Sequence, residues 1–201
     1  LGDVYKRQAL NKLTIKDRYP LNRIDDLIDS LRGATVFSAL DLTQGYYQLR
    51  IAPEDVPKTA FTTHIGLFEY KVLPMGLANA PSAFQRAINS IFAPYIGKFV
   101  CVYLDDILIY SKTAEEHLQH LEAVFKVLEQ NQLYIRMFKC TFNATEVKFL
   151  GHIVGNDQVK PDPKKVAAVE NWAVPTNVHE LRAFFGTGQL FFQIHSQARP
   201  P

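Results

Sequence analysis

The sequence has few cysteines, no long apolar run and almost no net charge. Its 201 residues include two cysteines and carry a formal charge of +2. Cys101 and Cys140 lie far apart and outside any spacing typical of metal ligands, so we expect two reduced thiols. No apolar run approaches the roughly 20 residues that span a bilayer, and the N-terminus lacks the order of a signal peptide. We therefore expect an intracellular protein with no membrane partner.

The charge balance does not decide what the protein binds. A domain that binds nucleic acid through a basic surface usually carries a larger excess of Lys and Arg. With 47% hydrophobic and 21% charged residues, the chain falls in the ordinary range for one or two compact domains. Because it begins at Leu1 and ends in a Pro-Pro pair beyond a helical pattern, we expect a fragment of a longer protein.

Turn and cap signals predict alternating helices and strands, which indicates an α+β fold. Asn22 is a candidate cap for a short helix that Gly33 ends, and Thr113 with Glu116 forms a capping box for a longer helix. The apolar face of that longer helix is expected to comprise Leu118, Leu121, Phe125 and Leu128. Further helices are expected to begin near 79–81, 162–163 and 177–180, and strands to cover 36–42, 46–51, 58–63, 68–73, 99–104, 107–110, 134–138 and 147–154.

Two adjacent acidic residues, Asp105 and Asp106, interrupt a pair of apolar strands. Their position predicts the tip of a tight hairpin. Two carboxylates a few ångströms apart repel each other, and apolar neighbours raise the cost of their charge, so a compensating cation is favoured. Mg²⁺ prefers such oxygen ligands and completes its shell with water and substrate phosphates. On its own, the pair is equally typical of a solvated turn.

A third carboxylate, Asp41, ends another apolar strand. A strand end can meet a hairpin tip, and three carboxylates from two strands can hold two metal ions about 3.5 to 4 Å apart. Because successive strand side chains point to opposite faces, we expect Asp105 to bind metal directly and Asp106 to shape the field or join the shell transiently. Taken alone, Asp41 is also compatible with a strand-end turn.

Several short motifs stand in one order along residues 9–186. Tyr103-Leu104-Asp105-Asp106 resembles the Tyr-x-Asp-Asp motif of reverse transcriptases, and Leu40-Asp41-Leu42 precedes it. The other matching stretches are Arg18-Tyr19-Pro20-Leu21, Lys58-Thr59-Ala60-Phe61, Leu73-Pro74-Met75-Gly76-Leu77, Ala80-Pro81-Ser82-Ala83-Phe84-Gln85 and Lys148-Phe149-Leu150-Gly151-His152. Together they resemble the reverse transcriptase of gypsy-type long-terminal-repeat retrotransposons, a part of the Pol polyprotein.

The resemblance implies a right-hand polymerase fold, in which an antiparallel palm sheet backed by helices holds Asp41, Asp105 and Asp106 as the catalytic, metal-binding residues. The implied activity is RNA-directed DNA polymerisation, in which two Mg²⁺ ions, or Mn²⁺ in their place, assist addition of deoxynucleotides to a primer 3′-hydroxyl. The implied partners are an RNA or DNA template with a DNA primer, and deoxynucleoside triphosphates. Template binding should be independent of sequence and weakened by salt. The parent element would act in a cytoplasmic particle or the nucleus.

The same resemblance implies roles for residues around the triad. Tyr46 would lie beneath the sugar of the nucleotide and exclude a 2′-hydroxyl, although core packing also explains it. Lys139 would approach the triphosphate, or else be an ordinary surface lysine. The other nucleotide-binding residues would be Leu42, Met75 and Gly76. The stretch that would position the primer end, and that is equally compatible with core packing, comprises Phe149, Leu150, Gly151 and His152.

The sequence departs from the family pattern near both ends. Residues 1–8 do not match the usual lead, and we expect them to be non-native. Residues 9–155 are expected to form partial fingers and the palm, and 156–201 a truncated helical thumb or connection segment. The fingers strands and the basic residues that clamp the triphosphate normally precede this part, and ribonuclease H, protease and integrase domains normally accompany it. Activity is therefore expected of the complete protein rather than of this chain alone.

Other interpretations stay open. The chain can be a catalytically inactive, nucleic-acid-binding relic of a retrotransposon polymerase, in which the triad persists without turnover. It can also be a two-metal nuclease, or an unrelated α+β protein with an accidental acidic hairpin. The order of the motifs argues against the last two.

Overall fold

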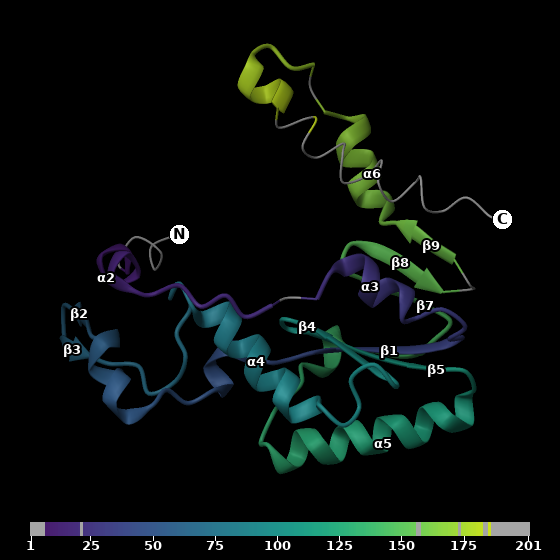
Figure 1. Cartoon of the computed structure of the whole chain (residues 1–201), viewed down its shortest axis with the longest axis horizontal. Helices are drawn as coiled ribbons and strands as arrows, with labels where there is room; N and C mark the ends of the chain where they lie inside the picture. Colours follow the sequence, from purple (N-terminus) through teal and green to yellow (C-terminus); the bar gives the residue numbers. More distant parts are fainter. Residues whose placement is uncertain (1–6, 21, 156–157, 173, 183–184, 186–201) are drawn as a thin grey trace.

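The computed structural model describes residues 7–20, 22–155, 158–172, 174–182 and 185 (Figure 1). The first six positions of the lead expected to be non-native, and most of the tail beyond 182, lie outside the described residues. Within the described part, no helix is long and apolar enough to cross a membrane. Both cysteines are free thiols, as expected, and burial raises the pKa of Cys101 to about 12.

A four-stranded antiparallel sheet forms the centre of the molecule. Its order is β4 (Val100–Tyr103), β5 (Asp106–Ser111), β1 (Val36–Asp41) and β6 (Thr141–Ala144). The sheet confirms the predicted antiparallel palm and the tight acidic hairpin, in which Tyr103 lies opposite Asp106. The remaining elements are α2 (Gln8–Leu13), α3 (Ile24–Asp29), η1 (Gly45–Gln48), η2 (Pro53–Thr59), β2 (Phe61–Thr63), β3 (Gly66–Phe68), α4 (Ala80–Phe92), α5 (Ala114–Gln130), η3 (Met137–Lys139), β7 (Glu146–Phe149), β8 (His152–Gly155), β9 (Gln158–Pro161) and α6 (Pro163–Glu170).

The two faces of the sheet pack against different layers. Leu40 of β1 and Ile107 of β5 belong to a buried cluster with residues of α4 and α5. Phe37 of β1 and Leu108 of β5 belong to a second cluster with residues of α3, β7 and β8. Figure 1 shows α5 along one side of the sheet and α3 on the other. Side chains alternate between the two faces along each strand. The odd-numbered residues of β1 and the even-numbered residues of β5 therefore lie on the face that packs against α3.

Local signals explain both long helices. Pro81 stands in the first turn of α4, where its missing N–H costs nothing. At the start of α5, Thr113 Oγ1 accepts a hydrogen bond from the Glu116 backbone N–H at 3.2 Å, which confirms the predicted cap. The predicted apolar face of α5 is partly wrong, because Leu118 is 60% exposed while His117 is fully buried. The cause is a set of polar partners for His117 on the sheet.

Two predicted strands are absent. Residues 46–51 begin with the 3-10 helix η1, because Gln44 has a φ of 48° and turns the chain out of β1. Residues 134–138 form one isolated bridge and then η3. The side chain of Gln48 explains both departures, since its Oε1 accepts from Tyr134 N at 2.7 Å and its Nε2 donates to Tyr134 O at 2.9 Å. A side-chain amide thus satisfies backbone groups that a strand would have paired.

Other predicted elements form with different boundaries. The hairpin across Gly66 is shorter than predicted, because 58–59 lie in η2 and only β2 and β3 pair. The predicted strand 147–154 is two strands, β7 and β8, since Leu150 and Gly151 have φ of 50° and 80° and reverse the chain. The cap of α3 is Arg23 rather than Asn22. The predicted start near 177 is confirmed by a hydrogen bond from Glu180 N to Asn177 Oδ1 at 2.9 Å.

A buried polar network joins α5 to the sheet. His117 contacts Ser38 Oγ through Nε2 at 2.7 Å and Ser111 Oγ through Nδ1 at 2.8 Å. Ser111 Oγ also lies 2.7 Å from His120 Nδ1. Burial and the nearby His120 lower the pKa of His117, so the folded chain favours its neutral form. Neutral imidazole can accept at one nitrogen and donate at the other, which matches two serine hydroxyls.

We predict that acid destabilises the fold partly through His117. The unfolded chain takes up a proton near the ordinary pKa of 6.5, whereas the folded chain resists it, so this contribution to stability falls as the pH drops below that value. In His117→Gln, urea denaturation should show a shallower loss of stability between about pH 7.5 and 5.5. His64→Gln at the exposed β2–β3 tip is the control for loss of a histidine. An unchanged slope in His117→Gln would contradict the prediction.

Candidate active site

Two of the three predicted carboxylates are direct partners across the sheet. The register of β1 with β5 sets Asp41 opposite Asp106. Residues directly opposite in an antiparallel pair project from the same face. Asp41 lies on the same face of β1 as Phe37, and Asp106 on the same face of β5 as Leu108, so both carboxylates lie on the face that packs against α3 and β7. Asp105 precedes Asp106 in the β4–β5 turn, so all three acidic residues gather at one end of the sheet.

The turn that holds Asp105 is fixed by a buried glutamine. Leu104 has a φ of 50°, a conformation that is uncommon for a residue with a side chain. Its backbone N–H donates to Gln85 Oε1 at 2.5 Å, and Gln85 Nε2 donates to Asn89 Oδ1 at 2.8 Å. Gln85 is 2% exposed and lies on α4. The helix thereby sets the backbone position immediately before the acidic pair.

Gly45 allows the chain after β1 to approach Asp105 closely. A Cβ at this position would lie 2.8 Å from Asp105 Oδ1 and 3.0 Å from the Phe84 ring. The next residue, Tyr46, packs against Phe84 with ring centroids 4.9 Å apart. Burial and the charge of Asp105 raise the pKa of Tyr46, so its phenol lies within electrostatic reach of the hairpin tip. Tyr46 therefore packs on the core and borders the acidic site at once.

The negative charges of the three acidic residues repel one another. Burial, Asp106 and Asp41, in that order, raise the pKa of Asp105. Burial and Asp41 raise the pKa of Asp106. The Oδ1 atom of Asp105 is buried without a hydrogen-bond partner. An unpartnered carboxylate oxygen beside two like charges is a costly arrangement that a cation would relieve.

Asp41 differs from the pair because two basic side chains approach it. Arg136 Nε lies 3.9 Å from Asp41 Oδ1, and Lys139 Nζ lies 3.8 Å from Asp41 Oδ2. Both basic residues come from the segment that contains η3. The structure therefore places Lys139 at the acidic site, beside Asp41 rather than remote from it.

The acidic residues are neighbours, but they do not form a finished metal site. Among the residues that the structure describes, no three His, Cys, Asp or Glu side chains form a group that could hold a metal ion. Convergence of Asp41, Asp105 and Asp106 on common ions thus stays a prediction. Their chemistry nevertheless fits a hard divalent cation, because all are carboxylates and Asp105 Oδ1 lacks a partner.

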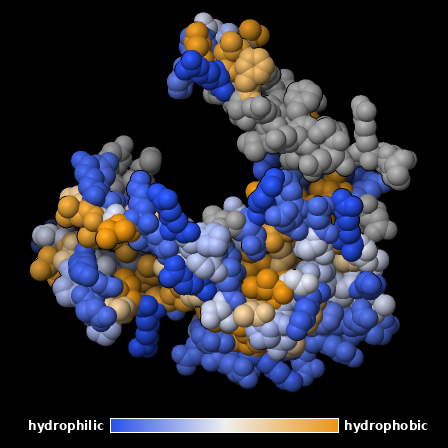
Figure 2. All heavy atoms as spheres, viewed as in Figure 1, coloured by the Kyte–Doolittle hydropathy of each residue, from blue (hydrophilic) through white to orange (hydrophobic). Residues whose placement is uncertain are grey.

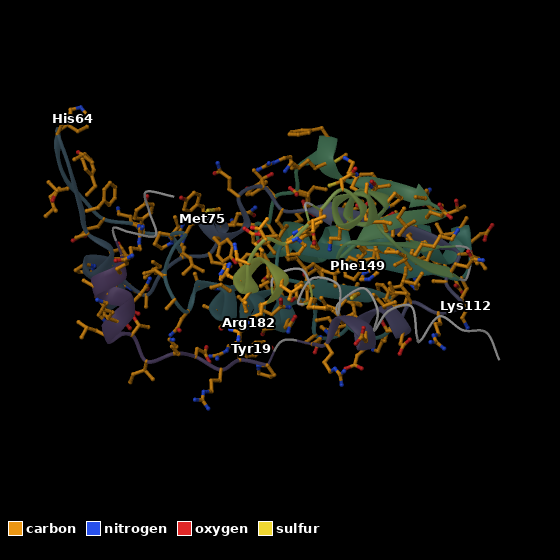
Figure 3. All side chains as sticks on the ribbon, turned by 90° about the horizontal axis from the view of Figure 1, so that it is seen from above. Tyr19, His64, Met75, Lys112, Phe149 and Arg182 are labelled. Carbon is orange, nitrogen blue, oxygen red and sulfur yellow. The ribbon has the colours of Figure 1, made fainter. Side chains whose placement is uncertain are left out.

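The other residues predicted to bind nucleotide occupy different environments. Leu42 is 3% exposed and lies in the core, so its side chain is a packing residue in this structure. Met75 is 48% exposed. Figure 3 places Met75 between His64, at the β2–β3 tip, and Phe149 along the long axis of the molecule. Gly76 follows with a φ of 88°, and its carbonyl accepts from Asn11 Nδ2 at 2.8 Å.

The predicted primer-positioning stretch forms the turn between β7 and β8. Phe149 is buried against the α3 face of the sheet, which agrees with a packing role for its side chain. His152 is 6% exposed, and its Nδ1 has no hydrogen-bond partner. Burial and the charge of Lys165 lower the pKa of His152. The turn lies on the same side of the sheet as Asp41 and Asp106.

Sequence reasoning missed two residues that shape the site. Gln85 was part of a recognised motif, but its hold on Leu104 was not predicted. A signal existed, because Gln85 interrupts the apolar stripe of α4 on its buried face. Arg136 carried no motif at all, and its contact with Asp41 joins segments far apart in the chain. Only the fold shows that pairing.

The chain belongs to the reverse transcriptase (RNA-dependent DNA polymerase) family, whose model matches residues 4–154. Among curated relatives, the retrovirus-related Pol polyprotein from transposon 297 of Drosophila melanogaster is 43% identical over 89% of this chain and 17% of its own length. The Pol polyprotein from transposon gypsy of the same species is 38% identical over 92% of the chain and 18% of its own length. The Tf2-3 polyprotein of Schizosaccharomyces pombe is 38% identical over 90% of the chain and 14% of its own length.

These relatives confirm the predicted likeness to gypsy-type retrotransposon polymerases. The chain spans less than a fifth of the length of the curated relatives described above. Solved structures agree on the fold. The foamy viral protease-reverse transcriptase in complex with double-stranded DNA matches with a TM-score of 0.84 at 25% identity, over 91% of this chain and 32% of that one. The same viral enzyme with an RNA/DNA hybrid gives a TM-score of 0.78 at 25% identity, over 90% and 24%.

We predict that Gln85→Met destabilises the hairpin tip. The substitution keeps the length of the side chain but removes the acceptor for Leu104 N–H, which leaves a partly buried donor unpaired. The expected loss in free energy of unfolding is about 1–3 kcal/mol, measurable by urea denaturation. Gln119→Met, at an exposed position of α5, is the matched control and should change little. Equal stability of both variants would show that Gln85 does not hold the turn.

Proposed function

We propose that this chain is the catalytic core of an RNA-directed DNA polymerase that adds deoxynucleotides to a primer 3′-hydroxyl. The observation that supports this most is the gathering of Asp41, Asp105 and Asp106 at one end of the palm sheet. One of their buried oxygens has no partner, and burial together with the charges of Asp106 and Asp41 raises the pKa of Asp105. Membership in the reverse transcriptase family supplies the reaction class.

The proposed cofactors are two Mg²⁺ ions, with Mn²⁺ as an alternative. Asp105 would bind through its unpartnered Oδ1, and Asp41 through the carboxylate that now faces two basic side chains. Asp106 would shape the field from its place opposite Asp41. When bound, divalent ions activate the attacking hydroxyl and stabilise charge on the leaving phosphate oxygen.

The protein itself would position the reacting groups. Gln85 fixes the turn before Asp105, and Gly45 lets that carboxylate sit close against the chain that follows β1. Small displacements of reacting groups cost large factors in rate, so a rigid backing is needed. Both contacts involve residues of α4, Gln85 behind Leu104 and Phe84 beside Gly45. The helix would therefore transmit core rigidity to the acidic tip.

Nucleotide selection is proposed to involve Tyr46. Its ring packs on Phe84 and lies near Asp105, which suits a flat surface beneath a sugar. A ring fixed in this way would exclude a 2′-hydroxyl from a sugar bound against it. Met75 and Gly76 would border the base and template, with Leu42 packed behind the site, and Lys139 would face the triphosphate. Lys139 already lies beside Asp41, which supports that role over an ordinary surface position.

The β7–β8 turn is proposed to position the primer end. Phe149 anchors the turn in the core, while Leu150 and Gly151 reverse the chain with φ of 50° and 80°. His152 completes the stretch from the first position of β8. Its location on the face of the sheet that bears Asp41 would bring a primer end toward the acidic residues.

Duplex binding is proposed for the hollow that Figure 2 shows between the β2–β3 side of the molecule and the α6 side. The foamy viral enzymes were solved in complex with double-stranded DNA and with an RNA/DNA hybrid. We propose that this chain takes an RNA or DNA template with a DNA primer, together with deoxynucleoside triphosphates. Contacts to phosphates would make binding independent of sequence and sensitive to salt.

The division of the chain also stays a proposal. Residues 9–155 would form partial fingers and palm, and 156–201 the start of a thumb or connection. The longer polyproteins would add ribonuclease H, protease and integrase domains. The intracellular setting predicted from the sequence, in a particle or the nucleus, stays a prediction as well.

One observation favours a second candidate function. Within the described part of the chain, no three potential ligands are placed to hold a metal ion, and Asp41 faces Arg136 and Lys139. In a relic that binds nucleic acid without turnover, Asp41 would stay paired with Arg136 and Lys139, and the carboxylates would never come together on a metal ion. The two candidates differ in whether metal binding draws the carboxylates together.

Primer extension tests the proposed function. The assay would use a DNA primer on an RNA template with Mg²⁺, and would compare this chain with a version extended upstream by the matching residues of the transposon 297 relative. Extension by either protein supports the polymerase. Extension by neither, with template binding intact, would favour the relic.

In whichever form is active, we predict that Asp105→Asn abolishes synthesis, because the neutral amide cannot replace the carboxylate as a cation ligand. Template binding, measured by fluorescence anisotropy, should change little, since phosphate contacts dominate it. Asp26→Asn, an exposed acidic residue of α3, is the matched control and should retain synthesis. Synthesis by Asp105→Asn would refute the metal assignment.

We also predict that Tyr46→Ala weakens discrimination against ribonucleotides. Removing the ring opens space beneath the sugar, so the ratio of kcat/KM for deoxynucleotides over ribonucleotides should fall. Tyr46→Phe keeps the ring on Phe84 and should preserve the ratio. An unchanged ratio in Tyr46→Ala would assign Tyr46 to core packing alone.

A further inference from the structure

Arg136 and Lys139 each approach a different oxygen of the Asp41 carboxylate. One oxygen faces the guanidinium at 3.9 Å, and the other faces the ammonium at 3.8 Å. These distances exceed those of a strong charge-assisted hydrogen bond, so the contacts are electrostatic rather than locked. The Arg136 side chain is 28% exposed and that of Lys139 49% exposed. Both side chains are therefore partly accessible to solvent and make no close hydrogen bond to Asp41.

The backbone around these side chains is held much more firmly. Arg136 N donates to Asp41 O at 2.8 Å, and Lys139 N donates to Arg136 O at 2.9 Å. The Cys140 thiol also approaches Arg136 O at 3.3 Å, while Asp41 N donates to Cys140 Sγ at 3.5 Å. The main chain of Arg136 is thus bound to that of Asp41. Any rearrangement at this position must come from the side chain.

A divalent cation at Asp41 would compete with the guanidinium. Arginine keeps its charge in proteins, so it cannot yield by losing a proton as a lysine can. It must turn away from the metal by rotating its side chain. The exposed ring of Phe138 offers one nearby surface, since the Arg136 guanidinium carbon already lies 5.9 Å from its centroid. A phosphate group offers a stronger one, because the guanidinium fork matches its oxygens.

We infer that Arg136 is a substrate-binding residue that occupies the Asp41 side of the site in the absence of metal and binds the phosphates of the incoming nucleotide when metal is present. This inference rests on the proposed function and adds a residue to it. Arg136 would neutralise Asp41 in the empty site and neutralise triphosphate in the loaded one. Its effects on metal affinity and on nucleotide affinity must then have opposite signs.

The opposite signs provide the test. Mn²⁺ binding to the whole 201-residue chain would be measured by electron paramagnetic resonance, first alone, and then with dTTP and a chain-terminated primer on an RNA template. Arg136→Gln should bind Mn²⁺ alone several-fold more tightly, because a competing cation is gone. The same variant should bind dTTP about tenfold more weakly, because a charge-assisted contact is lost.

Two further variants make the result specific. Arg136→Lys keeps the positive charge but loses the fork, so its affinity for Mn²⁺ alone should match that of the parent chain while dTTP binding weakens. Arg86→Gln removes an arginine of α4 whose guanidinium pairs with Asp17 at 2.6 Å rather than with Asp41, and it should change neither affinity. Circular dichroism of each variant checks that the fold is retained.

The outcomes separate this inference from the proposed function. If Arg136→Gln gains Mn²⁺ affinity without losing dTTP affinity, Arg136 is only a counterion of Asp41 and the inference is wrong. It is also wrong if Arg136→Gln changes neither affinity while Asp105→Asn loses Mn²⁺, although the proposed metal site then stands. If Asp105→Asn binds Mn²⁺ as tightly as the parent chain, the metal site itself is wrong and the inference falls with it.

Discussion

Repulsion among three carboxylates at one end of the palm sheet is the constraint on which the rest of the structure depends. The β1–β5 register sets Asp41 opposite Asp106, and the β4–β5 turn adds Asp105 beside them. Two basic side chains offset the charge of Asp41, but the buried Oδ1 of Asp105 keeps no partner. A protein that served only stability would gain by replacing such a group with an apolar one. The arrangement makes sense if the missing positive charge arrives with the substrate.

The two-sided packing of the sheet explains how this charge can be tolerated. One face is buried against α4 and α5, and the other against α3, β7 and β8, so both cores anchor the strands well behind the acidic end. Helix α4 also fixes the backbone near the acidic residues, because it places Phe84 against Gly45 and Gln85 against Leu104. The backbone of the acidic tip is therefore determined by the core, while its charges are left for a ligand to balance.

Local signals in the sequence were enough for β1, the β4–β5 hairpin, α4 and α5, because strand patterning and caps such as Thr113 act over a few residues. They failed where a partner lies far away in the chain. The segments 46–51 and 134–138 are not strands, since Gln48 pairs with the backbone of Tyr134 across 86 residues. In the same way, the motifs predicted site roles for the three carboxylates and Lys139, whereas nothing near Arg136 indicated that it would meet Asp41.

Asp105 is proposed to hold an uncompensated negative charge that a divalent cation would balance. Carbon-13 NMR of the aspartate carboxyl groups, with the Asp105 signal assigned by its loss in Asp105→Asn, measures this directly. Without metal, the pKa of Asp105 should lie above the ordinary value of 3.8, and Mg²⁺ should shift its signal and lower that pKa. An ordinary pKa together with a signal that does not respond to Mg²⁺ would contradict the account.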